Sequence, residues 1–203
     1  MKNTIILLFC CLPLWGISQE VSTIKVTGRA IHLDKTPTFL GSLTLSGTYS
    51  SYPSDAISLN QMKEKFNEAL QKNGFSLSDI KENQLSYQMQ GFEKEGTVYE
   101  IRTTSLQKML QFVNIKSFGV QKFKNLALIT IDAEENKILA RKALENATLK
   151  AKGIAEAMGK KLGKVIRVED FNNLVGIELE NYLSGYEPVG KRIYELNVIY
   201  TVE

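Results

Sequence analysis

His32 is the only histidine of the chain, and Asp34 follows it two residues later. A His-x-Asp pair can supply two metal ligands, or a general base with a carboxylate that orients it. A zinc site needs three or four protein ligands, and this pair provides only two. We therefore expect His32 to be a surface residue at the end of a strand, and we predict no metal site and no cofactor.

Two pairs of carboxylates, Glu134-Glu135 and Glu178-Glu180, have the residue types that glycoside hydrolysis needs. The first pair is better explained by the start of a helix, where acidic residues complement the positive end of the helix dipole. None of the serines lies in a Gly-x-Ser-x-Gly motif, which argues against serine catalysis. We predict no catalytic residue. A hydrolase with an unrecognised carboxylate pair is one alternative function.

Two glycines, Gly159 and Gly163, flank Lys160-Lys161-Leu162 in a spacing similar to that of a phosphate-binding loop. Such loops bind phosphate because they open a helix and direct its free backbone N–H groups at the anion. These glycines follow a predicted helix instead, so we expect them to end it.

The elements that position these residues follow from hydrophobic periodicity and from capping patterns at Ser58–Gln61, Thr104–Gln107 and Asp132–Glu135. The predicted helices are residues 59–73, 106–113 and 134–158, and the second of them is expected to bury Leu106, Met109, Leu110 and Val113. The predicted strands are residues 24–30, 38–49, 85–89, 98–103, 118–123, 126–131, 165–168 and 194–202, with 85–89 and 98–103 forming a hairpin. Residues 118–123 and 126–131 are either two strands or one bent strand.

The longest predicted helix carries an unusual apolar stripe. Its members recur at three- and four-residue spacing within about 120° of arc, and they are Ala140, Ala143, Ala147, Ala151, Ile154, Ala155 and Met158. Alanine buries little area, but it lets two backbones approach closely. We therefore expect this helix to lie tight against a sheet.

The amino terminus has the three parts of a cleavable signal peptide. Lys2 supplies the positive charge, an apolar run extends from Ile5 to Trp15, and the small residues Gly16 and Ser18 fit the cleavage rule. The run is too short for a transmembrane helix, which needs roughly 20 residues, and no later segment is apolar enough to span a membrane. We predict a signal peptide at residues 1–18 and an exported chain without a transmembrane segment, located in the periplasm or at the outer membrane.

Both cysteines, Cys10 and Cys11, lie inside this apolar run. Cleavage after Ser18 would leave no cysteine, which excludes disulfides, thiol nucleophiles and Cys-bound metals from the mature chain. Loss of Lys2 changes 25 basic and 22 acidic residues to 24 and 22. This near balance argues against a nucleic-acid partner, since nucleic-acid binders carry a strong basic excess.

The segment from Phe171 to Gly190 has no clean period, and connections of that length are usually functional or mobile. It holds apolar and aromatic residues suited to an interface between subunits or with a partner. The candidate interface residues are Phe171, Leu174, Tyr182 and Tyr186.

Several segments, taken in order, resemble the SIMPL domain family of bacterial envelope proteins. They are Val26-Thr27-Gly28, the run from Gly74 to Ile80, the alanine helix with its Gly-x-x-x-Gly turn and strand from Ala140 to Val165, and the closing strand Leu196 to Val202. Family members often carry Pro-Asp near the first strand pair, where this chain has Thr36-Pro37-Thr38.

The resemblance implies an α+β fold in which antiparallel sheets pack against one long alanine-striped helix and one or two shorter helices, as a single domain over residues 19–203. It also implies a non-enzymatic protein of the periplasm or outer membrane, with ring assembly in some members and a link to oxidative-stress tolerance. We expect a homo-oligomer, with an envelope protein as a further partner. A monomeric binding module for a small ligand or peptide is the other alternative function.

Overall fold

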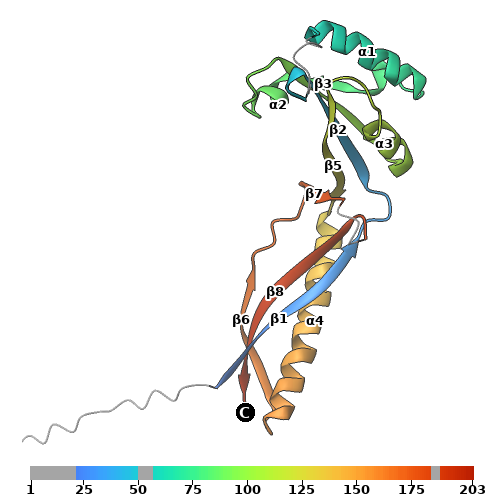
Figure 1. The fold of residues 1–203 in the computed structure, drawn as a ribbon. Coiled ribbons are helices and arrows are strands. Elements are labelled where there is room, and N and C mark those ends of the chain that lie inside the picture. Colours follow the sequence, from blue (N-terminus) through green and yellow to red (C-terminus); the bar gives the residue numbers. More distant parts are fainter. Residues whose placement is uncertain (1–21, 50–56, 184–187) are drawn as a thin grey trace, which may run out of the picture.

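The computed structural model describes residues 22–49, 57–183 and 188–203, and these form an elongated molecule with two lobes (Figure 1). The predicted signal peptide at residues 1–18 lies outside the described residues. The chain crosses from one lobe to the other after β1, β5, β6 and β7. Each lobe has its own cluster of buried apolar residues. The single domain over residues 19–203 stays a prediction.

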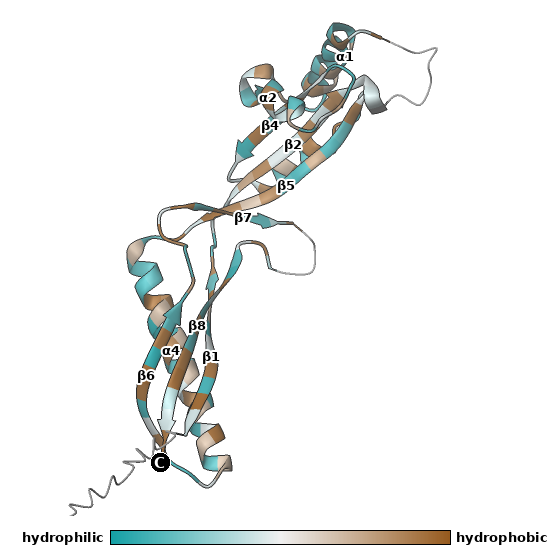
Figure 2. Cartoon of the chain, turned by 90° about the vertical axis from the view of Figure 1, so that its left-hand side faces the viewer, coloured by the Kyte–Doolittle hydropathy of each residue, from teal (hydrophilic) through white to brown (hydrophobic). Residues whose placement is uncertain are grey.

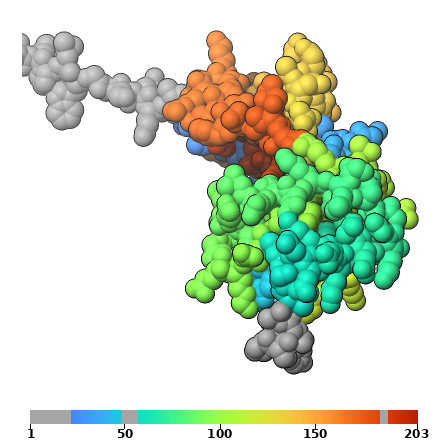
Figure 3. All heavy atoms as spheres, turned by 90° about the horizontal axis from the view of Figure 1, so that it is seen from above, coloured from blue at the N-terminus to red at the C-terminus, as the bar shows by residue number. Residues whose placement is uncertain are grey.

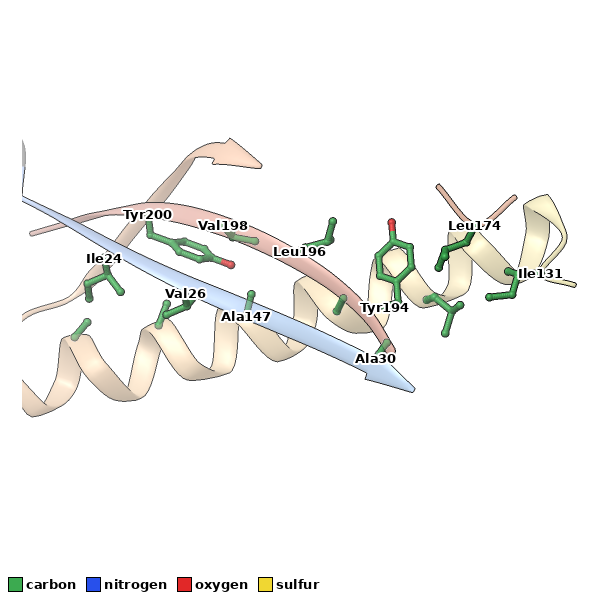
Figure 4. Packing of buried hydrophobic residues seen from close by; sticks show 14 of the residues in the cluster. Ile24, Val26, Ala30, Ile131, Ala147, Leu174, Tyr194, Leu196, Val198 and Tyr200 are labelled. Carbon is green, nitrogen blue, oxygen red and sulfur yellow. The ribbon is translucent and has the colours of Figure 1, made fainter. Parts of the chain in front are cut away.

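The lower lobe consists of a three-stranded antiparallel sheet and one long helix. The sheet has the order β1-β8-β6, with β1 at Thr23–Leu33, β8 at Lys191–Val202 and β6 at Leu162–Asp170. The helix α4 spans Ala133–Ala157 and covers one face of β1 and β8. Apolar and polar residues alternate along these strands (Figure 2), so that Ile24 and Val26 from β1 and Tyr200 from β8 point toward α4 (Figure 4).

A stripe of alanines lets α4 lie close to β1, as predicted. Ala143, Ala147, Ala151 and Ala155 are fully buried. Opposite them, Gly28 lies so near that a Cβ added to it would be 2.0 Å from the Ala143 carbonyl oxygen and 2.7 Å from the Ala147 Cβ. The absence of a side chain at Gly28 therefore sets the distance between the helix and the sheet.

The upper lobe is a five-stranded antiparallel sheet with the order β3-β4-β2-β5-β7. Its strands are β2 at Thr38–Ser46, β3 at Lys81–Asn83, β4 at Gly96–Thr103, β5 at Val120–Thr130 and β7 at Glu178–Tyr182. Its helices are α1 at Leu59–Lys72, α2 at Gln84–Gln88 and α3 at Leu106–Val113, with short 3-10 turns at Gly47–Tyr49 and Leu77–Asp79. Figure 3 views the molecule from above, with the cyan and green segments of the upper lobe toward the viewer.

The predicted α+β class is confirmed, with three shorter helices instead of one or two. The helix starts are also confirmed at α1 and α4. Ser58 and Gln61 form a reciprocal capping box, and the Asp132 side chain accepts a hydrogen bond from the Glu135 N–H. At α3 the cap is Ser105 and not Thr104.

The predicted hairpin between residues 85–89 and 98–103 is wrong. Residues 84–88 form the helix α2, in which only Tyr87 is buried, and β4 pairs with β3 on one side and β2 on the other. The alternating Leu85 and Met89 are exposed, so their spacing reflects no buried sheet face. The Asn83 side chain starts α2 by accepting a hydrogen bond from the Ser86 N–H.

Residues 118–131, predicted as one bent strand or two, contain the single strand β5, whose register against β2 shifts between Ser42 and Leu43. Two further element predictions change. The buried face of α3 is Met109, Phe112 and Val113, whereas Leu106 and Leu110 are partly exposed. In α4, Ile154 is exposed and Leu139 is buried, and Met158, which caps the end of the helix, is also exposed. The buried stripe steps by four residues in both directions from Ala143 and so leaves Ile154 and Met158 out.

Candidate binding site

An open groove of about 640 Å³ lies between β1 and α4. We call it the edge groove, and it is lined by Val26, Thr27 and Arg29 of β1 and by Leu149, Lys150, Gly153, Ile154 and Ala157 of α4. β1 is the outermost strand of its sheet, so one side of it has no neighbouring strand among the described residues. The volume falls within the roughly 300–1,000 Å³ typical of ligand sites.

Two hydrogen bonds show which backbone groups of β1 face this free edge. The Arg29 N–H donates to the Asn146 side-chain oxygen at 3.0 Å, and the Lys150 ammonium donates to the Thr27 carbonyl at 2.7 Å. Backbone groups alternate sides along a strand, so Lys25 also presents its N–H and carbonyl at the edge. Unpaired edge groups readily bind another strand. Side chains of α4 already pair with the Thr27 carbonyl and the Arg29 N–H, so α4 covers this part of the edge and leaves the part at Lys25 uncovered.

The wall of the groove on α4 is apolar and open. The exposed fractions of Leu149 and Ile154 are 71% and 43%, and a Cβ added at Gly153 would meet no atom within 4 Å. Glycine inside a helix costs about 1 kcal/mol relative to alanine. Here the missing side chain leaves the middle of the groove unobstructed.

The charged residues that line the groove are both cationic. They are Arg29 and Lys150. The Arg29 Nε lies 2.6 Å from a carboxylate oxygen of Glu195, in an ion pair. The Nζ of the nearby Lys25 lies 3.5 Å from a carboxylate oxygen of Glu169. The Lys150 ammonium donates to the neutral Thr27 carbonyl, so this contact does not neutralise its positive charge. The groove therefore favours a ligand that carries carboxylates along with apolar groups.

The structure separates His32 from Asp34. The His32 Nδ1 lies 3.0 Å from a carboxylate oxygen of Glu135. His32 lies at the end of β1, as expected, but its side chain is only 14% exposed, so the residue is partly buried and does not lie fully on the surface. Asp34 instead accepts a hydrogen bond from the Thr36 N–H, which forms the turn between β1 and β2. These two residues therefore do not act on one site.

The carboxylate pairs also have structural roles. Glu134 and Glu135 lie in the first turn of α4, as predicted. In the second pair, Glu178 forms an ion pair with Arg102, and Glu180 lies exposed on the same strand.

Two other carboxyl groups have shifted pKa values, and both values are lowered. The backbone N–H and the hydroxyl of Ser76, together with Lys108, lower the pKa of Asp79 to about 2. Burial alone would raise the pKa of Asp170, but hydrogen bonds from Tyr194 and Asn172 outweigh burial and lower it. A carboxyl that works as a general acid needs a raised pKa, so neither group suits that role.

Gly159 and Gly163 have the structural role that their position predicts. Gly159 has a φ of 68° and ends α4, where the Gly159 and Lys160 N–H groups bond back to Glu156 and Ala155. This is the usual geometry of a glycine that ends a helix. Gly163 lies in β6 against Thr201, where a side chain would clash.

The four candidate interface residues have different environments. Phe171 and Tyr182 are exposed, with fractions of 81% and 63%, whereas Leu174 is buried in the apolar cluster of the lower lobe. Tyr186 lies outside the described residues. The segment also contains the strand β7, which the sequence pattern did not indicate. Their role in an interface stays a prediction.

Within the described ranges, no group of three or more His, Cys, Asp and Glu side chains could hold a metal ion. In the same ranges, no helix is long and apolar enough to cross a membrane.

Sequence reasoning missed the residues that form the edge groove. Leu149, Lys150 and Gly153 lie along one side of the alanine stripe, at helical spacing. A glycine inside a strongly helical segment was the available signal, since it lowers helix propensity without a turn to explain it.

Comparison with known proteins gives a family and no curated relative. None of the curated proteins matches the chain. The family model that matches is SIMPL, described as a protein of unknown function (DUF541), and it covers residues 44–192. The match includes the upper lobe except the first part of β2, the alanine-striped helix and the start of the last strand, so this chain belongs to the SIMPL family.

Proposed function

We propose that this protein is an exported, non-enzymatic envelope protein that acts by self-association, with the edge groove as a contact surface. The observation that carries the proposal is the free edge of β1 beside an open, apolar groove. An exposed strand edge next to a helix is a recurring site for the addition of an extended segment. The signal pattern of residues 1–18 supports export.

The non-enzymatic part is supported by the bonding of the candidate catalytic groups. His32 pairs with Glu135, Glu178 pairs with Arg102, and Asp170 accepts hydrogen bonds from Tyr194 and Asn172. Each group is held by a contact within the fold. A link to oxidative-stress tolerance would have to act without thiols, because both cysteines lie in the predicted signal peptide.

The mass of the chain in solution tests self-association. We would purify the chain that starts at Gln19 and measure its mass by size-exclusion chromatography with light scattering over a range of micromolar concentrations. We expect a multiple of the monomer mass. A strict monomer at every concentration would contradict the proposal and favour the monomeric binding module.

Gly153 provides a matched pair of variants for the contact surface. Gly153→Trp places a large side chain in the open groove, and Gly153→Ala adds only one carbon there. We expect Gly153→Trp to shift the mass toward the monomer and Gly153→Ala to leave it unchanged. An assembly that Gly153→Trp leaves intact would remove the groove from the proposal.

A further inference from the structure

We infer that the edge groove binds strand β7 of a second copy of this chain. This inference rests on the proposed self-association and names the two surfaces that meet. β7 is the edge strand of the upper-lobe sheet and pairs only with β5 among the described strands. Each copy therefore offers one groove in the lower lobe and one free strand at the upper-lobe sheet edge.

The exposed face of β7 complements the groove in charge and in polarity. Glu178, Glu180 and Tyr182 alternate with the buried Leu179, so their side chains share one face of the strand. Glu180 and Tyr182 are exposed, and Tyr182 is one of the residues predicted for an interface. The groove presents Arg29 and Lys150 beside an apolar wall. Arg29 already pairs with Glu195 and Glu178 with Arg102 within one copy, so the charge pair that forms between copies is Lys150 with Glu180. The Tyr182 ring meets Leu149 and Ile154 of the groove.

Pairing exchanges one contact of Lys150 for another. In the free chain the Lys150 ammonium donates to the Thr27 carbonyl. A backbone N–H of an incoming strand takes over that carbonyl, as in strand addition to a sheet. The ammonium is then available to the Glu180 carboxylate. The five residues of β7 span about 17 Å at roughly 3.3 Å per residue, a length that the eleven residues of β1 exceed.

The other free edge of the lower sheet is less suited to this pairing. β6 exposes Val165, Ile166 and Val168, but its register against β8 shifts twice, between Leu162 and Arg167. Such irregularities bend and twist a strand, and they discourage edge-to-edge pairing. The register of β1 against β8 runs without a shift from Thr23 to Leu33. The regular edge is therefore the one that accepts a strand.

The two surfaces are different, so the contact joins copies head to tail. Contacts of this kind give closed rings where the rotation closes and open chains where it does not. A head-to-tail contact also predicts how mixtures of two variants behave. A copy with a blocked groove still offers β7, and a copy with an altered β7 still offers its groove.

The test uses single and mixed variants of the chain that starts at Gln19, with mass measured by light scattering. Lys150→Glu and Glu180→Lys should each weaken self-association roughly tenfold to a hundredfold, because each places like charges together. The double variant Lys150→Glu/Glu180→Lys should restore assembly. Lys152→Glu is the control, since Lys152 is on the same helix, pairs with Glu156 and does not line the groove; it should have no effect.

A mixture then shows whether the contact is head to tail. At a concentration where Gly153→Trp and Glu180→Lys are each monomeric alone, an equal mixture of the two should form a one-to-one dimer and no larger species. Self-association that resists all of these changes but is lost in Val168→Asp would place the contact on β6. That result would overturn this inference and leave self-association standing, whereas a monomeric unmodified chain would end both.

Discussion

The substitution Gly28→Ala tests the packing on which the lower lobe depends. The added Cβ would lie 2.0 Å from the Ala143 carbonyl oxygen and 2.7 Å from the Ala147 Cβ. Neither neighbour can rotate away, because one is backbone and the other is the first atom of its side chain. Overpacking of a core typically costs 1–3 kcal/mol, so we expect a loss of about 3 kcal/mol here, which lowers the Tm by about 6–12 °C for a chain of this size.

Thermal and urea unfolding followed by far-UV circular dichroism would measure this loss. Tryptophan fluorescence cannot follow the unfolding, because Trp15, the only tryptophan, lies in the predicted signal peptide. Gly153→Ala is the matched control, since its Cβ meets no atom within 4 Å and removal of a helix glycine should raise stability by about 0.5–1 kcal/mol. A Gly28→Ala variant as stable as the unmodified chain would refute the close approach of α4 to β1.

Three further changes test the capping and the pKa shifts. Asp132→Ala removes the side chain that accepts the Glu135 N–H at 2.8 Å, and urea unfolding should show a loss of about 1 kcal/mol. Tyr194→Phe removes a hydrogen bond to Asp170 that lowers the pKa of that carboxyl, so a carboxyl NMR titration should show the pKa of Asp170 rising; an unchanged pKa would contradict the bond. The pKa of Asp79 is lowered from 3.8 to about 2. The ionised Asp79 carboxylate should stabilise the fold above pH 4, and this stabilisation should be lost as the pH falls through about 2. The amide NMR shifts near Asp79 should follow this titration, and Asp79→Asn should abolish their pH dependence.

The long elements of the fold were predictable because their patterns are local. The spacing of Ala143, Ala147, Ala151 and Ala155 predicted both α4 and its tight packing, and Asp132 marked its start. The unbroken alternation from Tyr194 to Val202 predicted β8 in the same way. In each case a single face is buried along the whole element, so period and burial agree.

The prediction was wrong where burial is decided by distant segments. Leu85, Tyr87 and Met89 alternate, but α2 buries only Tyr87, whose hydroxyl bonds to Ser46 and to the Lys94 carbonyl. β7 was missed because it is only five residues long and its partner β5 is distant in sequence. No local pattern contains that information.

The candidate site was less predictable than the fold. Tyr182 was identified from its aromatic character in a long connection, but the edge groove requires β1 and α4 to be placed side by side. Thr27 and Lys150 are 123 residues apart in sequence. Their contact follows from the packing of Gly28 against the alanines of α4. The sequence predicted the alanine stripe but not the strand that packs against it.

Amide hydrogen exchange at the free edge of β1 tests the central claim most directly. The N–H groups of Lys25 and Thr27 face that edge, so they exchange with solvent unless another strand pairs with them. We predict slow exchange of both in a concentrated sample of the chain that starts at Gln19, and fast exchange on dilution or in Gly153→Trp. Fast exchange at both amides in the assembled protein would contradict the claim that the edge of β1 binds a second copy.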